Sequence, residues 1–381
     1  MSQAPAPISM PHPSPSRRLA RALAWSAALT VGTVVLRELV RPRPGEEARF
    51  IDWDAVEAVA LRRCGEEGDV ALPAAVQAAY QEMAAELVPN LTAELGPSTV
   101  TRWAPSAIQP VGRRDWVRFN VRLFRQMLEP LRALEAMLPG SVLLRLGRGG
   151  MTRYLGLMLG LLARRVLGQY DPALLAAEPL ETGDLILVEP NVQAWAKKDG
   201  LPIDELRRWL GMHELTHAWE FRAHPWLQPY LEGLLKEVLI GRLTEGRRPS
   251  PLELLRTLTI GVGRQWKAIA RLQAAMTVLE GYCNLVMDEV GRRQLPHFAL
   301  LERAYRRRQE QRPPLERAFL RVTGLEMKMR QYVQGERFCR AALEAGGREL
   351  LARLWEGPDS LPTAAEIAAP ALWVDRIGAG G

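Results

Sequence analysis

The sequence has little cysteine and little histidine, and both shortages limit the chemistry that it can carry. Of 381 residues, three are cysteine and five are histidine. Cys64, Cys283 and Cys339 are too few and too scattered for a disulfide framework or a zinc site made of cysteines. A chain without a disulfide framework suits a reducing compartment, so we predict a cytoplasmic location.

The sequence also lacks a strong excess of charge of one sign. Its 50 basic residues against 43 acidic ones give a net charge of +7, which is a mild excess in a chain of this size. The basic residues are not interleaved with aromatic ones in the way that a base-stacking surface needs. An arginine-rich, solvated surface explains the charge, and we predict no nucleic-acid partner.

No apolar run at the amino terminus is long enough to cross a bilayer. The uncharged stretch 22–36 has 15 residues, against the roughly 20 that a spanning helix needs. Three interpretations stay open: a helix packed on the domain, peripheral membrane association through residues 19–40, and a cleaved signal peptide. We predict a disordered tail, a short apolar helix and a linker over 1–44, and a single domain over 45–381.

Helical patterns dominate the rest of the chain. Apolar residues recur at spacings of three and four, as in Val76, Ala79, Tyr80 and Met83. Strand signals are sparse, and the best is the short apolar run 185–188, which suits an edge strand followed by a turn. We therefore predict a mainly α fold with a small β-sheet.

Two of the five histidines form the string His-Glu-Leu-Thr-His at residues 213–217. The surrounding segment 202–221 is predicted to be a helix, so the spacing of four places both imidazoles on one face. There His213 and His217 can bind one Zn²⁺ through neutral nitrogens, while Glu214 reaches a bound water instead of the metal. The competing interpretation is a structural pair of histidines.

A catalytic zinc of this kind keeps three protein ligands, so the third must come from elsewhere. The metzincin pattern needs glycine at position 220 and histidine at 223, but the sequence has Glu220 and Ala223. The best candidate is Glu280 on a second apolar helix, where an acid is costly to bury unless it is paired or bound to metal. The alternative for it is an exposed helix charge. Asn284 or Asp288, on the next turns, could hold the second nitrogen of a histidine ligand.

Several longer strings accompany the histidine motif. They are I-D-W-D at 51–54, R-V-L-G-Q-Y-D at 165–171, L-V-E-P-N at 187–191, H-E-L-T-H-A-W-E-F at 213–221, L-E-G-Y-C-N-L-V-M-D at 279–288 and K-M-R-Q-Y-V-Q-G-E-R-F-C at 328–339. Through them the sequence, from about residue 50 to the carboxyl end, resembles a family of zinc-dependent metallopeptidases of zincin-like, gluzincin-type fold. The family is best known from actinobacteria and Chloroflexi and is often labelled as associated with deazaflavin-coenzyme biosynthesis, although no residue here indicates a flavin-type site. The resemblance implies that His213, His217 and Glu280 are ligands and that Glu214 is the base.

One stretch departs from the family pattern. The family commonly reads E-G-H-A-D after the third ligand, whereas this chain has Tyr282 in place of the histidine and Asn284 in place of the aspartate. A neutral amide accepts a hydrogen bond from an imidazole but does not stabilise positive charge as a carboxylate does. The departure leaves open whether zinc affinity or turnover is altered.

These residues predict a zinc metallopeptidase acting on a peptide or protein substrate. Zinc makes its water acidic and polarises the scissile carbonyl, and Glu214 takes the proton and passes it to the leaving amine. Tyr282, His224 and Tyr230 are candidate donors to the oxyanion, and each also has a structural interpretation. The alternative function is a zinc-stabilised binding or scaffold protein without turnover.

Overall fold

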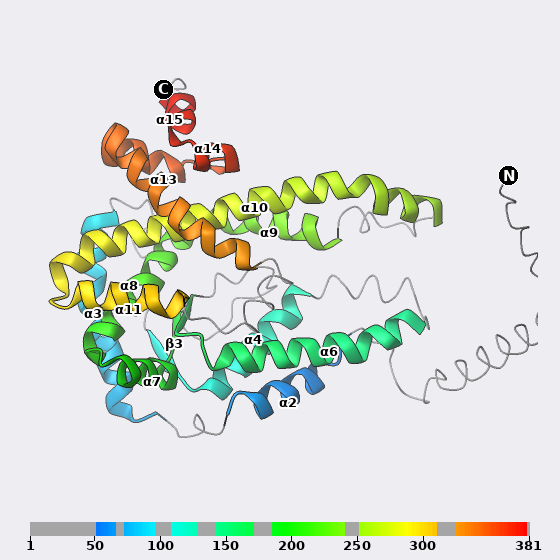
Figure 1. The fold of residues 1–381 in the computed structure, drawn as a ribbon, viewed down its shortest axis with the longest axis horizontal. Helices are drawn as coiled ribbons and strands as arrows, with labels where there is room; N and C mark the ends of the chain where they lie inside the picture. Colours follow the sequence, from blue (N-terminus) through cyan, green and yellow to red (C-terminus); the bar gives the residue numbers. More distant parts are fainter. Residues whose placement is uncertain are drawn as a thin grey trace, which may run out of the picture.

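The computed structural model describes residues 51–65, 72–95, 108–128, 142–170, 185–240, 251–310 and 325–378 (Figure 1). Within these residues the chain is mostly helical with one small sheet, which confirms the predicted fold class. The tail, apolar helix and linker predicted over 1–44 lie outside the described residues. The single domain over 45–381 stays a prediction.

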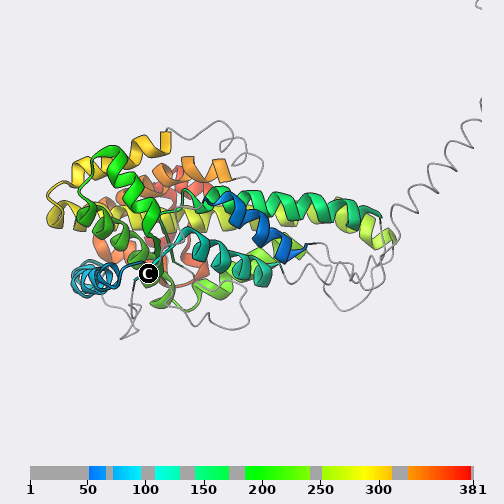
Figure 2. The same ribbon diagram turned by 90° about the horizontal axis from the view of Figure 1, so that it is seen from below.

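The long helix α10 runs along the long axis of the molecule, and α6 runs nearly parallel to it on the other side of the sheet (Figures 1 and 2). The strands are β1 (Gln109–Val111), β2 (Gly168–Tyr170) and β3 (Leu185–Val188). The helices are α2 (Trp53–Arg63), α3 (Ala74–Leu95), α4 (Arg113–Met127), α6 (Val142–Ala163), α7 (Glu189–Asp199), α8 (Ile203–Arg222), α9 (Leu227–Ile240), α10 (Pro251–Gln294), α11 (Phe298–Glu310), α13 (Leu325–Ala352), α14 (Ala364–Ala368) and α15 (Pro370–Gly378).

Strand β3 is the central strand of the sheet, and this corrects the expectation that residues 185–188 form an edge strand. The strand order is β1-β3-β2, with β1 parallel and β2 antiparallel to β3. All four residues of β3 are buried, because a continuous apolar run without alternation is covered on both faces. The expected turn behind it is the first turn of α7, where Pro190 fits because its missing N–H needs no partner.

The sheet separates two apolar cores. Leu185 and Leu187 face the larger core, which contains residues of α3, α7, α8 and α10. Ile186 and Val188 face the smaller core, which α2, α4 and α6 close from the other side. The candidate histidines lie on α8, so the site forms on the side of the larger core.

Helix α8 is anchored at its amino-terminal end by a buried ion pair. Asp204 and Glu205 occupy its first turn, where the partial positive charge of the helix favours acids. Arg207 pairs with Glu189 of α7, whose side chain is fully buried, and Tyr80 of α3 donates a hydrogen bond of 2.5 Å to the same carboxylate. Removing one partner of such a pair costs about 3–5 kcal/mol. This network fixes α8 against α3 and α7.

None of the described helices is both long and apolar enough to cross a membrane. This finding contradicts the localisation expected from the sequence. That expectation was a cytoplasmic chain associated with a membrane through the apolar segment 19–40. Residues 19–40, on which it rested, lie outside the described residues.

Candidate metal centre

The second helix of the site, α10, is held in place by direct backbone contact with α13. A Cβ added to Gly281 would lie 2.1 Å from the carbonyl carbon of Gly335, and one added to Gly335 would lie 2.0 Å from the oxygen of Thr277. Only glycine allows the two helices to approach this closely. The contact fixes the rotation of α10 and turns Glu280 and Cys283, one helical turn apart, toward α8.

His213, His217 and Glu280 converge from these two helices. One carboxylate oxygen of Glu280 lies 3.8 Å from Nε2 of His213 and 3.7 Å from Nε2 of His217. The two imidazole rings are perpendicular, with their centres 4.7 Å apart. The three side chains are 20%, 13% and 14% exposed, so the cluster is largely buried but reaches the surface. The structure thus brings together the three residues predicted as ligands, and their role as ligands stays a prediction.

The donor set fits a zinc ion. Ligand bonds of about 2.0–2.1 Å place the donors of a tetrahedral site about 3.4 Å apart. The separations of 3.8 and 3.7 Å between Glu280 and the two Nε2 atoms are close to this value. Two imidazoles and one carboxylate are also the donor types that a catalytic zinc takes, with a fourth position left for water.

A carboxylate holds the other nitrogen of His217. Glu220 Oε2 lies 2.7 Å from His217 Nδ1, and the Glu220 side chain is fully buried. Burial raises the pKa of Glu220 to about 7, and the neighbouring imidazole opposes that rise. Burial lowers the pKa of His217, but the charge and hydrogen bond of Glu220 outweigh it, and the pKa lies well above its usual value. The pair therefore orients the ring with Nε2 toward Glu280.

His213 sits in different surroundings. Its Nδ1 lies 3.1 Å from Cys283 Sγ and 3.2 Å from Met287 Sδ, both of which come from α10. Burial and the charge of His217 together lower its pKa to about 4, against the opposing charge of Glu280, so the ring is neutral at physiological pH. A neutral ring has one unprotonated nitrogen, which a metal needs.

Cys283 also contributes to a set of potential metal donors, because the atoms of His213, His217 and Cys283 lie within 4.8 Å of one another. Its sulfur, however, lies at Nδ1 of His213, whereas Glu280 lies at Nε2. The two nitrogens of an imidazole point in nearly opposite directions, so one ion does not bind both. Because His217 also directs Nε2 toward Glu280, the carboxylate fits the third ligand position better than the thiol.

Glu214, the candidate base, lies under the edge strand β2. It is buried, and a Cβ added to Gly168 would lie 2.6 Å from its Oε1 and 2.5 Å from Cδ2 of Leu187. Antiparallel pairing places Gly168 opposite Leu187 on β3. A glycine at this position of β2 is therefore what allows the carboxylate to approach the strand so closely.

We expect Gly168→Ala to lower the hydrolytic kcat by about 10²-fold, because the new methyl group displaces the Glu214 carboxylate by about 1 Å. Steady-state kinetics would measure the loss, and circular dichroism would check that the fold is kept. The matched control is Gly233→Ala on α9, where an added Cβ meets nothing within 4 Å. If Gly168→Ala were as active as Gly233→Ala, the function of Glu214 would not depend on the absence of a side chain at residue 168.

The two residues predicted to support a histidine ligand both lie on α10. Asp288 pairs with Arg292 at 3.0 Å and with Arg340 at 2.9 Å, and Asn284 is half-buried on α10. The carboxylate that lies beside a histidine nitrogen is Glu220, and the supporting role expected of Asn284 or Asp288 stays a prediction.

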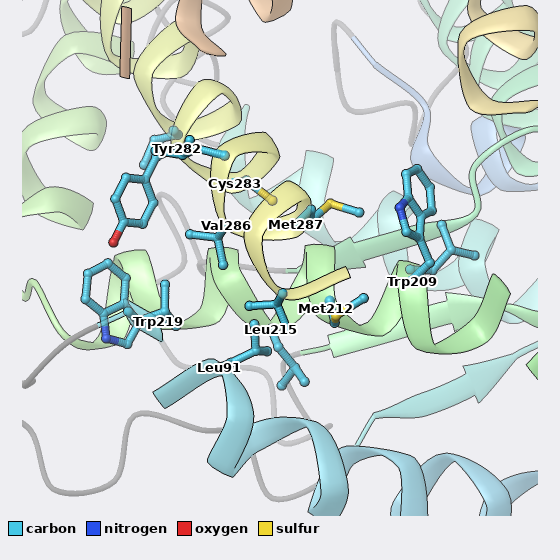
Figure 3. Close-up of a cluster of buried hydrophobic side chains, with 14 of the residues drawn as sticks. Leu91, Trp209, Met212, Leu215, Trp219, Tyr282, Cys283, Val286 and Met287 are labelled. Atoms are coloured by element: carbon cyan, nitrogen blue, oxygen red, sulfur yellow. The ribbon is translucent and has the colours of Figure 1, made fainter. Parts of the chain in front are cut away.

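The three candidate oxyanion donors are engaged in aromatic packing. Tyr282 stacks on Trp219, with ring centres 5.6 Å apart, and Figure 3 shows it reaching from α10 to that indole. His224 stacks on Trp355 at 4.6 Å and contacts the backbone oxygen of Glu220 through Nδ1. Tyr230 packs against Trp226 and under the guanidinium of Arg271. Packing contacts of this kind are what the structural interpretation of the three side chains predicts.

The sequence-based predictions gave Glu220 no role beyond the rejection of the metzincin pattern and gave Cys283 no role beside the histidines. A signal for Glu220 was present, since it follows His217 by three residues and therefore lies on the same helix face. No comparable signal existed for the contact of Cys283 with His213, because it depends on how α10 crosses α8.

The comparisons with known proteins agree with this geometry. The sequence profile of a family described as zincin-like metallopeptidase matches residues 51–374. The chain belongs to this family. Family members of this kind usually bind zinc, and the described cluster offers a group that can hold a metal.

A crystal structure from Chloroflexus aurantiacus, described as a "putative hydrolase with a novel fold", is similar to this zincin-like chain with a TM-score of 0.67 and 35% identity. The match covers 87% of this chain and all of the other. No curated protein matches the chain. The family and this structural relative both support a hydrolase.

Proposed function

We propose that the chain is a zinc-dependent peptidase in which Glu214 acts as the general base. The observation that carries the proposal is the placement of one Glu280 oxygen at 3.8 and 3.7 Å from the Nε2 atoms of His213 and His217. A metal would displace the proton that the raised pKa keeps on His217, and the ligand set would then be two neutral imidazoles and one carboxylate. When bound, the ion supplies Lewis acidity to a water and to a carbonyl oxygen.

The sheet edge supports a peptide as the substrate class. Within the described residues, β2 pairs only with β3, so its other side is an open edge. An extended peptide can add to such an edge through main-chain hydrogen bonds. Glu214 lies directly under Gly168 of this strand, so a peptide bond held along β2 passes close to the base.

Each side chain of the site has a different role in the proposed reaction. Glu214 accepts a proton from the attacking water and returns it to the leaving amine, as a buried carboxylate next to the substrate can. Glu220 keeps His217 oriented through Nδ1 and adds negative charge behind the ligand set.

The test is digestion of a peptide library by the full chain, with cleavage products identified by mass spectrometry. We expect cleavage by the zinc-loaded protein, loss of cleavage after removal of the metal with EDTA, and recovery when Zn²⁺ is returned. Zinc binding at one ion per chain without any cleavage would contradict the peptidase and would support the zinc-stabilised binding protein.

A further inference from the structure

The nitrogen of His213 that faces away from Glu280 contacts two sulfur atoms. Met287 Sδ lies 3.2 Å and Cys283 Sγ 3.1 Å from His213 Nδ1, and both residues come from the same side of α10. Both side chains are buried, with exposures of 3% and 0%, so little water competes for this nitrogen. Figure 3 shows the two sulfurs on neighbouring turns of α10, where it crosses α8.

The chemistry of these sulfurs determines which nitrogen carries the proton. A thioether has no hydrogen to donate and acts only as a weak acceptor. The 3.2 Å contact with Met287 is therefore a hydrogen bond only if Nδ1 carries the proton and donates it. In a neutral imidazole the lone pair then lies on Nε2, the atom that faces Glu280.

Cys283 completes this arrangement from the next turn. Its Sγ lies 3.4 Å from the backbone oxygen of His213, so the thiol can donate its hydrogen there. Its sulfur is then free to accept from the Nδ1–H, 3.1 Å away. The thiol thus binds both the ring and the backbone of one residue, which restricts rotation of the imidazole.

We propose that Met287 and Cys283 are positioning residues that hold His213 in the tautomer with its lone pair on Nε2, directed at the metal. The proposal rests on the proposed function insofar as it takes that atom to be a zinc ligand. The two histidines are then oriented by different chemistry: Glu220 supplies a carboxylate to His217, and uncharged sulfurs serve His213. This arrangement orients the second ring without adding another negative charge.

The experiment uses the full chain with ¹⁵N-labelled histidine, because five histidines give few signals. In the metal-free protein we expect the His213 signals, assigned by their loss in His213→Gln, to report a protonated Nδ1 and an unprotonated Nε2. A double variant combines Cys283→Val with Met287→Leu, a change nearly equal in volume. In this double variant we expect His213 to be a mixture of its two tautomers. Zinc affinity, measured by chelator competition, should fall about 10–100-fold in that double variant.

Two further variants separate positioning from packing. Cys283→Ser keeps a donor and an acceptor at this position, so its zinc affinity should lie within a few fold of that of wild type. Cys339→Ser changes another buried thiol and should leave the zinc affinity unchanged. Co²⁺-loaded wild type should lack a thiolate-to-cobalt absorption band, because the sulfur is not a ligand.

A thiolate band in wild type, an Nε2–H tautomer, or unchanged tautomer and affinity in both Met287→Leu and the double variant would overturn the proposal. The tautomer is read without metal and without substrate. If His213 carries its proton on Nδ1 but the protein cleaves no peptide, the peptidase is rejected and this inference stands. If the protein cleaves peptides but His213 carries its proton on Nε2, this inference is rejected and the peptidase stands.

Discussion

Glu214→Gln is expected to lower kcat for peptide cleavage by about 10²–10⁴-fold while zinc content stays at the wild-type level. The amide has nearly the same size and shape as the carboxylate, so it fits under Gly168, but it does not take up a proton. Peptide turnover by mass spectrometry and metal content by elemental analysis would measure the two effects on the same preparation.

The matched control is Glu205→Gln, the same change in the first turn of the same helix, where the side chain contacts His297 at 2.6 Å. We expect this variant to keep its activity. Turnover by Glu214→Gln equal to that of Glu205→Gln would remove Glu214 from the mechanism.

Glu280→Ala is expected to reduce zinc affinity more than 100-fold, beyond the 10–100-fold loss typical of a residue that only supports a ligand. The reason is that its carboxylate is the donor from α10 that lies near both Nε2 atoms. Chelator competition would measure the affinity, and thermal unfolding in the absence of metal would check that the fold persists.

Asp288→Ala provides a matched control on the same helix, because this acid pairs with Arg292 and Arg340 instead of the histidines. We expect its zinc affinity to equal that of wild type. Should Glu280→Ala also bind zinc normally, the third ligand would have to be another group, and Cys283 would be the first to test.

The helix of the candidate centre could be predicted from sequence because its signals are local. The acids at positions 204 and 205, the apolar spacing and the four-residue separation of His213 and His217 all lie within one segment, and α8 spans Ile203–Arg222. The sequence also singles out Glu280, since a carboxylate on an apolar helix is costly unless it has a partner, and the structure places it near both histidines.

The sheet could not be predicted from local signals. Strand β2 has three residues, Gly168–Tyr170, which is too short for any alternation to be recognised. The run 185–188 was recognised as a strand, but its place between β1 and β2 depends on pairing with segments far away in the sequence. The role of Glu220 likewise emerges only when its full burial is known.

The contact between Gly281 and Gly335 has a consequence for the biogenesis of the protein. Because α13 fixes the rotation of α10, the carboxylate at 280 reaches its place only after a segment near the carboxyl end has been synthesised and docked. The histidine pair leaves the ribosome well before that moment. If the proposed function holds, zinc would therefore bind late in the biogenesis of the protein, and we expect chains truncated before Gly335 to bind less metal than the full chain.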